Sequence, residues 1–231
     1  MVAATLAGPA QARAPGYIEP AAADPAPAAL VHTPIIVLDV KADLEKGFAM
    51  LGKGQGEKAV GYFDRVIAAA DGQLGNDPRP RRCVMDGAAP GTANVVSVDE
   101  ALCDAHFGRG YALIDLGRGD LAEADLRAAA EMAPDNAHFA NEYAELFKSR
   151  RDWTMAYALF EKAWNVADKT MGGPNADLAA RALRGMGYAQ EKMGHLDAAH
   201  DLIARSLQFE PASEAGRVQL AHVERMLAIG S

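Results

Sequence analysis

The sequence has few aromatic residues, few cysteines and no long apolar stretch, and each shortage narrows what the chain can be. Aromatic residues make up 6% of the 231 residues although 50% are hydrophobic, so aliphatic side chains must build most of the core. No apolar run reaches the ~18–20 residues that a membrane-spanning helix needs. The net charge is −8 and no basic stripe is visible, which argues against nucleic acid as a partner.

Patterns that bind metals or carry out catalysis are missing as well. Cys83 and Cys103 have no histidine pair nearby, so they do not form a zinc site. His195 and His200 are five positions apart, which places them on different faces of a helix. The run 47–54 approaches a phosphate-binding loop but lacks the Ser or Thr that must reach magnesium. We therefore expect no metal, no cofactor and no enzyme activity.

What the chain does contain is an internal repeat. Seven glycine, small, apolar and proline positions between Gly110 and Pro134 recur 77 positions later, between Gly187 and Pro211. The matched residues are Gly110, Ala112, Gly117, Ala122, Leu126, Ala129 and Pro134 with Gly187, Ala189, Gly194, Ala199, Ile203, Ser206 and Pro211. Two weaker copies bring the number of units to four, at 40–73, 103–136, 137–170 and 180–213. The two central units follow each other directly, with a period of 34 residues.

This period and pattern resemble the tetratricopeptide repeat (TPR) family, over about residues 40–213. The resemblance implies an all-α fold, a right-handed α-solenoid of four TPR-like helix pairs. Small residues would lie where paired helices approach most closely, and Gly117 and Gly194 would take positive φ in the turns. Pro134 and Pro211 would end the second helix of their units. An irregular Ala-rich helical bundle is the alternative.

Two insertions interrupt the repeat, at 74–102 and 171–179. The first is polar and rich in turn residues, and it ends in Ser97–Glu100, which we interpret as a capping box for a helix that begins near Val98. The second is predicted to be a lengthened turn with Asn175 as the cap of the next helix. Each insertion either carries specificity or is a tolerated loop without a role.

The two ends of the chain differ in composition. Residues 214–231 are amphipathic and are predicted to form a helix that caps the last unit. Residues 1–14 end in an A-x-A pattern, which favours the remnant of an export signal over an Ala-rich disordered tail. Residues 15–34 are rich in Ala and Pro and are predicted to be an extended tether to a helical domain at 35–231. The apolar segment 35–38 fits either an extended piece docked on unit one or the start of a helix.

Whether the two cysteines form a disulfide depends on the compartment in which the protein resides. In an exported protein Cys83 and Cys103 could form a disulfide that closes a loop of about 20 residues, worth ~3 kcal/mol in the chain-entropy model. We expect a periplasmic or cell-envelope protein on the strength of residues 1–14. The alternative is a cytoplasmic protein with two inert thiols.

The TPR resemblance also implies a function. In that family the first helices of the units line a concave groove that binds a peptide or protein. The residues at those positions that suit such contacts are Phe107, Tyr111, Asn141, Glu145, Lys148, Arg181, Arg184, Tyr188 and Lys192. Some family members hold a C-terminal carboxylate with Lys and Asn residues, and here Asn141 is present but the matching Lys is not.

We therefore expect a noncatalytic scaffold for protein–protein interaction, without a membrane span. Two alternatives remain open at this point. One is an enzyme, or an enzyme subunit, in which the insertion 74–102 completes a site. The other is a structural element that self-associates through its convex face.

Overall fold

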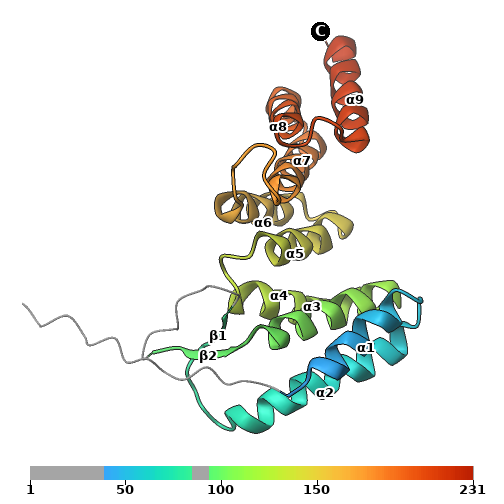
Figure 1. Ribbon diagram of the computed structural model, residues 1–231. Helices are drawn as coiled ribbons and strands as arrows, with labels where there is room; N and C mark the ends of the chain where they lie inside the picture. Colours follow the sequence, from blue (N-terminus) through green and yellow to red (C-terminus); the bar gives the residue numbers. More distant parts are fainter. Residues whose placement is uncertain (1–38, 85–93, 231) are drawn as a thin grey trace, which may run out of the picture. The chain divides into compact units, whose positions relative to one another are not determined.

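The computed structural model of the protein describes residues 39–84 and 94–230, which belong to one compact unit (Figure 1). The expected export-signal remnant at 1–14, the tether at 15–34 and the apolar segment 35–38 lie outside the described residues. The same holds for the middle of the first insertion, 85–93.

Helices that follow each other along the chain pack as pairs (Figure 1). The pairs are α1 (Lys41–Leu51) with α2 (Gly56–Leu74), α3 (Glu100–Asp115) with α4 (Gly119–Met132), α5 (Ala137–Ser149) with α6 (Trp153–Val166), and α7 (Ala176–Lys192) with α8 (Leu196–Phe209). A further helix, α9 (Glu214–Gly230), packs on α8 and also contacts α7. The predicted all-α solenoid of four helix pairs with an additional C-terminal helix is confirmed. None of the helices in the described ranges is long and apolar enough to cross a membrane.

The repeated small residues lie where the two helices of a pair touch. A Cβ atom on Gly110 of α3 would come 2.8 Å from Leu126 of α4, and one on Gly187 of α7 would come 2.6 Å from Ile203 of α8. Both distances are too short for carbon atoms, so any larger residue would force the paired helices apart. The repeated small residues therefore mark the contacts between the two helices of a pair.

The turns between paired helices share one backbone conformation. Gly54, Gly117 and Gly194 have φ values of 66°, 72° and 85°, in the left-handed region where glycine carries no steric cost. The third pair uses Arg151, whose φ of 62° makes it the one non-glycine residue with positive φ in the described part of the chain. The turn geometry is thus kept even where the glycine is absent.

The first insertion contains two short strands that the sequence analysis did not predict. Strand β1 (Arg81–Val84) and strand β2 (Val96–Asp99) pair in parallel, from Arg81 opposite Val96 to Val84 opposite Asp99. A disulfide joins Cys83 of β1 to Cys103 of α3. These strands tie the insertion to the second helix pair.

The predicted capping box at Ser97–Glu100 is wrong. Ser97 lies in β2 and is buried, because the pairing of β2 with β1 keeps its backbone extended. Helix α3 begins at Glu100, two residues later than Val98, and the carboxylate of Asp99 caps it by accepting a hydrogen bond from the backbone N–H of Ala101.

The second insertion is only partly a turn. Helix α7 already begins at Ala176, so residues 176–179 are helical rather than part of the lengthened turn. Asn175 does occupy the N-cap position of α7, but its side chain makes no capping hydrogen bond.

The hydrophobic core is divided along the chain. One cluster joins α1–α4 with the two strands and reaches Phe139 of α5, and a second joins α5, α6, α7 and the end of α8. A small third cluster, Ala199, Ile203 and Val223, anchors α9 on α8. The first two clusters meet on α5, where Phe139 belongs to the first cluster and Ala137 and Ala140 belong to the second.

Candidate functional site

The first helices of the units carry the residues expected in the groove, and those on α3 lie among aromatic rings. The ring of Phe107 is 6.3 Å from Tyr111, 6.5 Å from Phe48 of α1 and 5.6 Å from Phe139 of α5, centre to centre. Tyr111 is 43% exposed and Ile114, one turn on, is 40% exposed. This end of the surface therefore offers apolar area to a partner.

The groove residues expected on α5 and α7 come together around a pocket of about 220 Å³. Its lining residues are Glu145, Lys148, Arg181, Arg184, Gly185, Tyr188, Ala215 and Gln219. Five of them belong to the set expected from the sequence, and they lie on two helices that contact each other. Because the two helices are separated by α6 in the chain, only the fold brings these five side chains together.

The cations of this pocket are held by carboxylates. Lys148 Nζ lies 2.5 Å from Glu145. Arg181 Nη1 donates to Glu142 at 2.5 Å, and Arg184 Nη1 donates to Glu210 at the same distance. Burial lowers the pKa of Arg181, but the hydrogen bond and the charges of Glu142 and Glu145 more than offset this and raise it. The three cations therefore have fixed positions.

Tyr188 forms an aromatic wall beside these charges. Its ring centre is 5.8 Å from that of Trp153, with the rings edge to face. The ammonium groups of Lys148 and Lys192 lie 5.5 and 4.9 Å from the centre of the Tyr188 ring. Lys192, which does not line the pocket, is also paired with Glu191 at 2.7 Å.

Asn141 takes a different place from the other expected groove residues. It is fully buried, and its amide Nδ2 donates to the backbone carbonyl of Leu178 at 3.1 Å, which joins α5 to α7. Its Oδ1 atom has no hydrogen-bond partner among the described residues. Asn141 therefore holds two helices together and does not face a partner in this structure.

Asp104, in the first turns of α3, has a strongly raised pKa. Burial, followed by the charges of Glu100 and Asp99, raises the pKa of Asp104 to about 6. Perturbed pKa values occur in active sites and also in structural networks of charged groups. Within the described ranges no group of His, Cys, Asp and Glu is arranged to hold a metal ion, and both cysteines are in the disulfide. The raised pKa of Asp104 is explained by its burial and its acidic neighbours.

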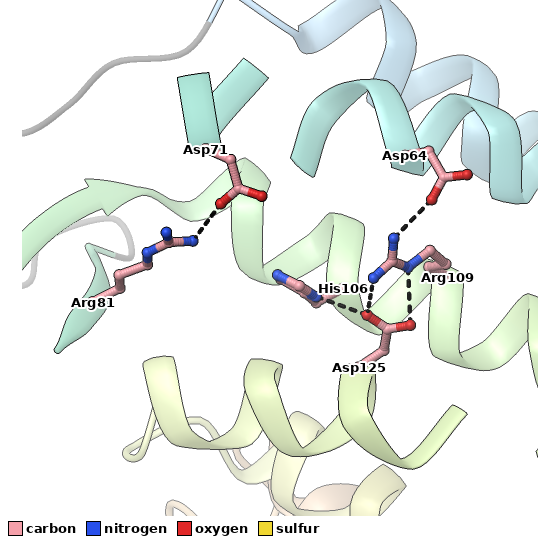
Figure 2. A network of polar contacts seen from close by, with 6 residues as sticks. All are labelled: Asp64, Asp71, Arg81, His106, Arg109 and Asp125. Carbon is pink, nitrogen blue, oxygen red and sulfur yellow. Dashed lines mark hydrogen bonds and ion pairs between the residues drawn. The ribbon is translucent and has the colours of Figure 1, made fainter. Parts of the chain in front are cut away.

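A second polar cluster joins three helices (Figure 2). The carboxylate of Asp125 on α4 accepts hydrogen bonds from Arg109 Nε at 2.9 Å and Nη2 at 2.7 Å, and it lies 2.8 Å from His106 Nδ1. Arg109 Nη1 also reaches Asp64 of α2 at 2.7 Å. Burial raises the pKa of Asp125, yet the hydrogen bonds from His106 and Arg109 outweigh it and the pKa lies below its usual range. The cluster ties α2, α3 and α4 together.

A larger pocket, about 550 Å³, lies next to the disulfide. Its lining residues are Arg82, Cys83, Ala133, Pro134, Asp135, Asn136, Ala137, His138, Val166, Asp168, Asn175 and Leu178. Arg82 is paired with Asp135 and Asn136 caps α5, so these polar groups already have structural partners. Burial lowers the pKa of His138, which favours its neutral form.

The contribution of α9 to this pocket was not predicted from the sequence. Ala215 and Gln219 line the pocket of about 220 Å³, although residues 214–231 were expected only to cap the last unit. The repeat frame contained a signal, because extending it beyond residue 213 places Ala215 at the second position of a further unit, a groove position in the family.

Comparison with known proteins supports the fold. No protein-family model and no curated protein matches the sequence. The solved structure of Pseudomonas aeruginosa PilF is similar over 82% of this chain and 69% of its own, with 15% identity and a TM-score of 0.59. A putative kinesin light chain with TPR-like repeats from Podospora anserina matches over 80% of this chain and 85% of its own, with 14% identity and a TM-score of 0.58.

A third structure contains a bound peptide. The first TPR of Spaghetti (RPAP3), bound to the HSP90 peptide SRMEEVD, matches over 57% of this chain and 97% of its own, with 18% identity and a TM-score of 0.50. The four helix pairs, the left-handed φ values of their turn residues and these similar structures all indicate the same fold. The chain therefore has the tetratricopeptide-repeat fold over most of its length.

Proposed function

We propose that this chain is a noncatalytic scaffold that binds an extended peptide segment of a protein partner along α3, α5 and α7. The observation that carries the proposal is that the first helices of successive units present both kinds of surface: Tyr111 and Ile114 are exposed on α3, and charged side chains of α5 and α7 surround the pocket at Tyr188. Aromatic surface supplies binding energy, whereas fixed charges supply orientation. The peptide seen on the RPAP3 repeat shows that the same fold can hold such a ligand.

The test uses a displayed library of random peptides. A selected peptide should bind the Tyr111→Ala/Tyr188→Ala variant at least about tenfold more weakly, because truncating central aromatic side chains costs more than about 1.4 kcal/mol. Binding is measured by fluorescence anisotropy. Tyr62→Ala is the control, since Tyr62 lies on α2, a second helix, and stacks on Arg65.

Equal affinities of the wild type and the Tyr111→Ala/Tyr188→Ala variant for every selected peptide would refute binding on this face. A size in solution that increases with concentration, together with no selected peptide, would instead support self-association.

We also infer that the protein works in an oxidising compartment, the periplasm or cell envelope. The pairing of Cys83 with Cys103 supports this, because disulfides persist in such compartments and are rare in the cytosol. Intact mass with and without alkylation should show no free thiol in protein recovered from the periplasm. Two alkylated cysteines in that material would contradict the inference.

A further inference from the structure

We propose that the outer edge of strand β1 is a second binding site, where an extended peptide segment of a protein partner pairs with the backbone of Arg81 and Cys83. This site goes beyond the groove proposed above and does not depend on it. It lies beside the pocket of about 550 Å³, none of whose lining residues also lines the pocket of about 220 Å³. The two sites can therefore be tested separately.

The hydrogen bonds of the two-stranded sheet show which side of β1 faces away from β2. The N–H of Val96 donates to the carbonyl of Pro80 at 2.8 Å, and Arg81 lies opposite Val96. Backbone groups of alternate strand residues point to the same side, so Pro80 and Arg82 direct theirs toward β2. The N–H and C=O groups of Arg81 and Cys83 point to the other side, where they have no hydrogen-bond partner within residues 39–84 and 94–230. This edge therefore presents two donors and two acceptors to a further strand.

The pocket of about 550 Å³ extends along this edge. Arg82 and Cys83 of β1 both line it, although successive side chains of a strand point to opposite faces. A space bordered by both residues lies at the edge between these faces. The disulfide from Cys83 to Cys103 of α3 fixes β1 before a peptide binds, so the cost of ordering falls on the peptide alone.

An extended peptide is the occupant that matches the groups on this edge. Donors and acceptors that alternate along a strand pair with the main chain of another strand, whatever its sequence. Charge does not select the ligand, because Arg82 is already paired with Asp135. The pocket also has apolar lining residues, which are Ala133, Pro134, Ala137, Val166 and Leu178. We therefore expect an apolar side chain on the face of the peptide that points into the pocket.

The first experiment tests the backbone of the peptide on the full-length wild-type protein. Peptides are selected from a displayed random library on the Tyr111→Ala/Tyr188→Ala variant, so that the groove aromatics cannot contribute. They are then synthesised with a single N-methyl group at each backbone position in turn, and binding is measured by fluorescence anisotropy. Only alternate residues of an added strand point their N–H toward β1, so every second position should lose affinity about fivefold, the net worth of one hydrogen bond.

The second experiment removes a donor from the protein. Arg81→Pro deletes an N–H that points away from β2, so the two strands stay paired and the peptide should bind about fivefold more weakly. Arg81→Ala is the matched control, because it loses the same ion pair with Asp71 but keeps the backbone N–H. Its affinity should equal that of the wild type. If Arg81→Pro has a lower melting temperature than Arg81→Ala, the N-methyl series on the wild type decides.

Three results would overturn this site. The first is that no peptide is selected on the Tyr111→Ala/Tyr188→Ala variant, and the second is an equal affinity, or an equal loss, at successive methylated positions. The third is self-association that Arg81→Pro abolishes, which would assign the edge to a second copy of the chain. None of them bears on the groove, which is judged by peptides that lose affinity when Tyr111 and Tyr188 are replaced.

Discussion

The two halves of the helical unit are held together by different means. In α1–α4 a disulfide, a two-stranded sheet and the buried Asp125 cluster connect elements that are distant in sequence. In α5–α9 the long-range polar links are ion pairs such as Arg181–Glu142 and single bonds such as that of Asn141, and half-exposed charges surround a pocket. The first half is thus covalently cross-linked, whereas the second half contains no cysteine and its charged side chains pair with one another around the pocket.

The division follows from the chemistry of a repeat protein. Each unit contacts only its neighbours, so stability is close to a sum of local terms. The core clusters divide within α5, where Phe139 belongs to the first and Ala140 to the second, so we expect the two halves to respond independently on either side of this helix. A change in one half should therefore affect hydrogen exchange in that half first.

The largest effect should come from removing the disulfide. Cys83→Ala/Cys103→Ala should lower the free energy of unfolding by about 3 kcal/mol, since a loop of about 20 residues is no longer closed in the unfolded chain. Hydrogen exchange should accelerate in β1, β2 and α3 and stay unchanged in α7–α9. Reduction of the wild type should reproduce this pattern. Equal acceleration through α9 would show that the halves unfold as one.

Substituting one buried glycine in each half allows the packing of the two halves to be compared directly. A Cβ atom on Gly108 would lie 2.4 Å from the ring of Phe63, and one on Gly185 would lie 2.5 Å from the ring of Phe160. Overpacking of this kind costs about 1–3 kcal/mol. Gly108→Ala should cost more than Gly185→Ala, because Gly47 also packs closely on the Phe63 ring, with a Cβ distance of 2.5 Å, which leaves the ring less room to move.

The measurement for both glycine variants is chemical denaturation. Gly72→Ala is the control, because nothing lies within 4 Å of the added Cβ atom and the residue is inside α2. It should stabilise the protein by about 0.5–1 kcal/mol, since alanine restricts the unfolded chain. If Gly185→Ala is the costlier of the two, the second half is packed more rigidly than the first.

Other close-packed glycines show how much of the fold can be predicted from the sequence. Gly110 and Gly187 repeat because helices touch there, so a pattern of small residues predicted the helix pairs correctly. The strands β1 and β2 were not predictable, because four-residue strands carry little periodicity and their pairing spans the insertion. Ser97 matched the capping pattern, but tertiary pairing put it in a strand. The place of Ala215 in the pocket lining could not be predicted, because it depends on where α9 packs, and a local sequence pattern does not give that position.

A smaller effect should follow from replacing the partly buried Asp104 of α3. The folded-state pKa of Asp104 is about 6 against 3.8 unperturbed, so the folded protein binds more protons than the unfolded chain between these values. Its contribution to stability is therefore fully present below about pH 4 and is lost as the pH rises through about 6. Asp104→Asn should stabilise the protein by about 1 kcal/mol near pH 7.5, after allowance for solvent screening, and leave it unchanged near pH 4.

Denaturation of the wild type and Asp104→Asn at the two pH values checks this. Asp125→Asn should show the opposite dependence, because the pKa of Asp125 is lowered and its stabilising contribution is lost as the pH falls through the folded value. A constant difference between wild type and Asp104→Asn at both pH values would mean that the charge of Asp104 is not the cause.

The smallest effect should come from the turn of the third helix pair. Arg151 holds a φ of 62°, where an L-residue is strained by about 1–2 kcal/mol, but glycine at the same place loses more backbone entropy on folding, which offsets part of the relief. Arg151→Gly should therefore raise stability by about 0.5 kcal/mol, measured as a shift of the denaturation midpoint at constant slope. The reverse change, Gly117→Arg, should destabilise the first half by a similar amount, since Gly117 has a φ of 72° and open space around it. If the two changes do not have opposite signs, turn strain does not contribute to a difference in stability between the halves.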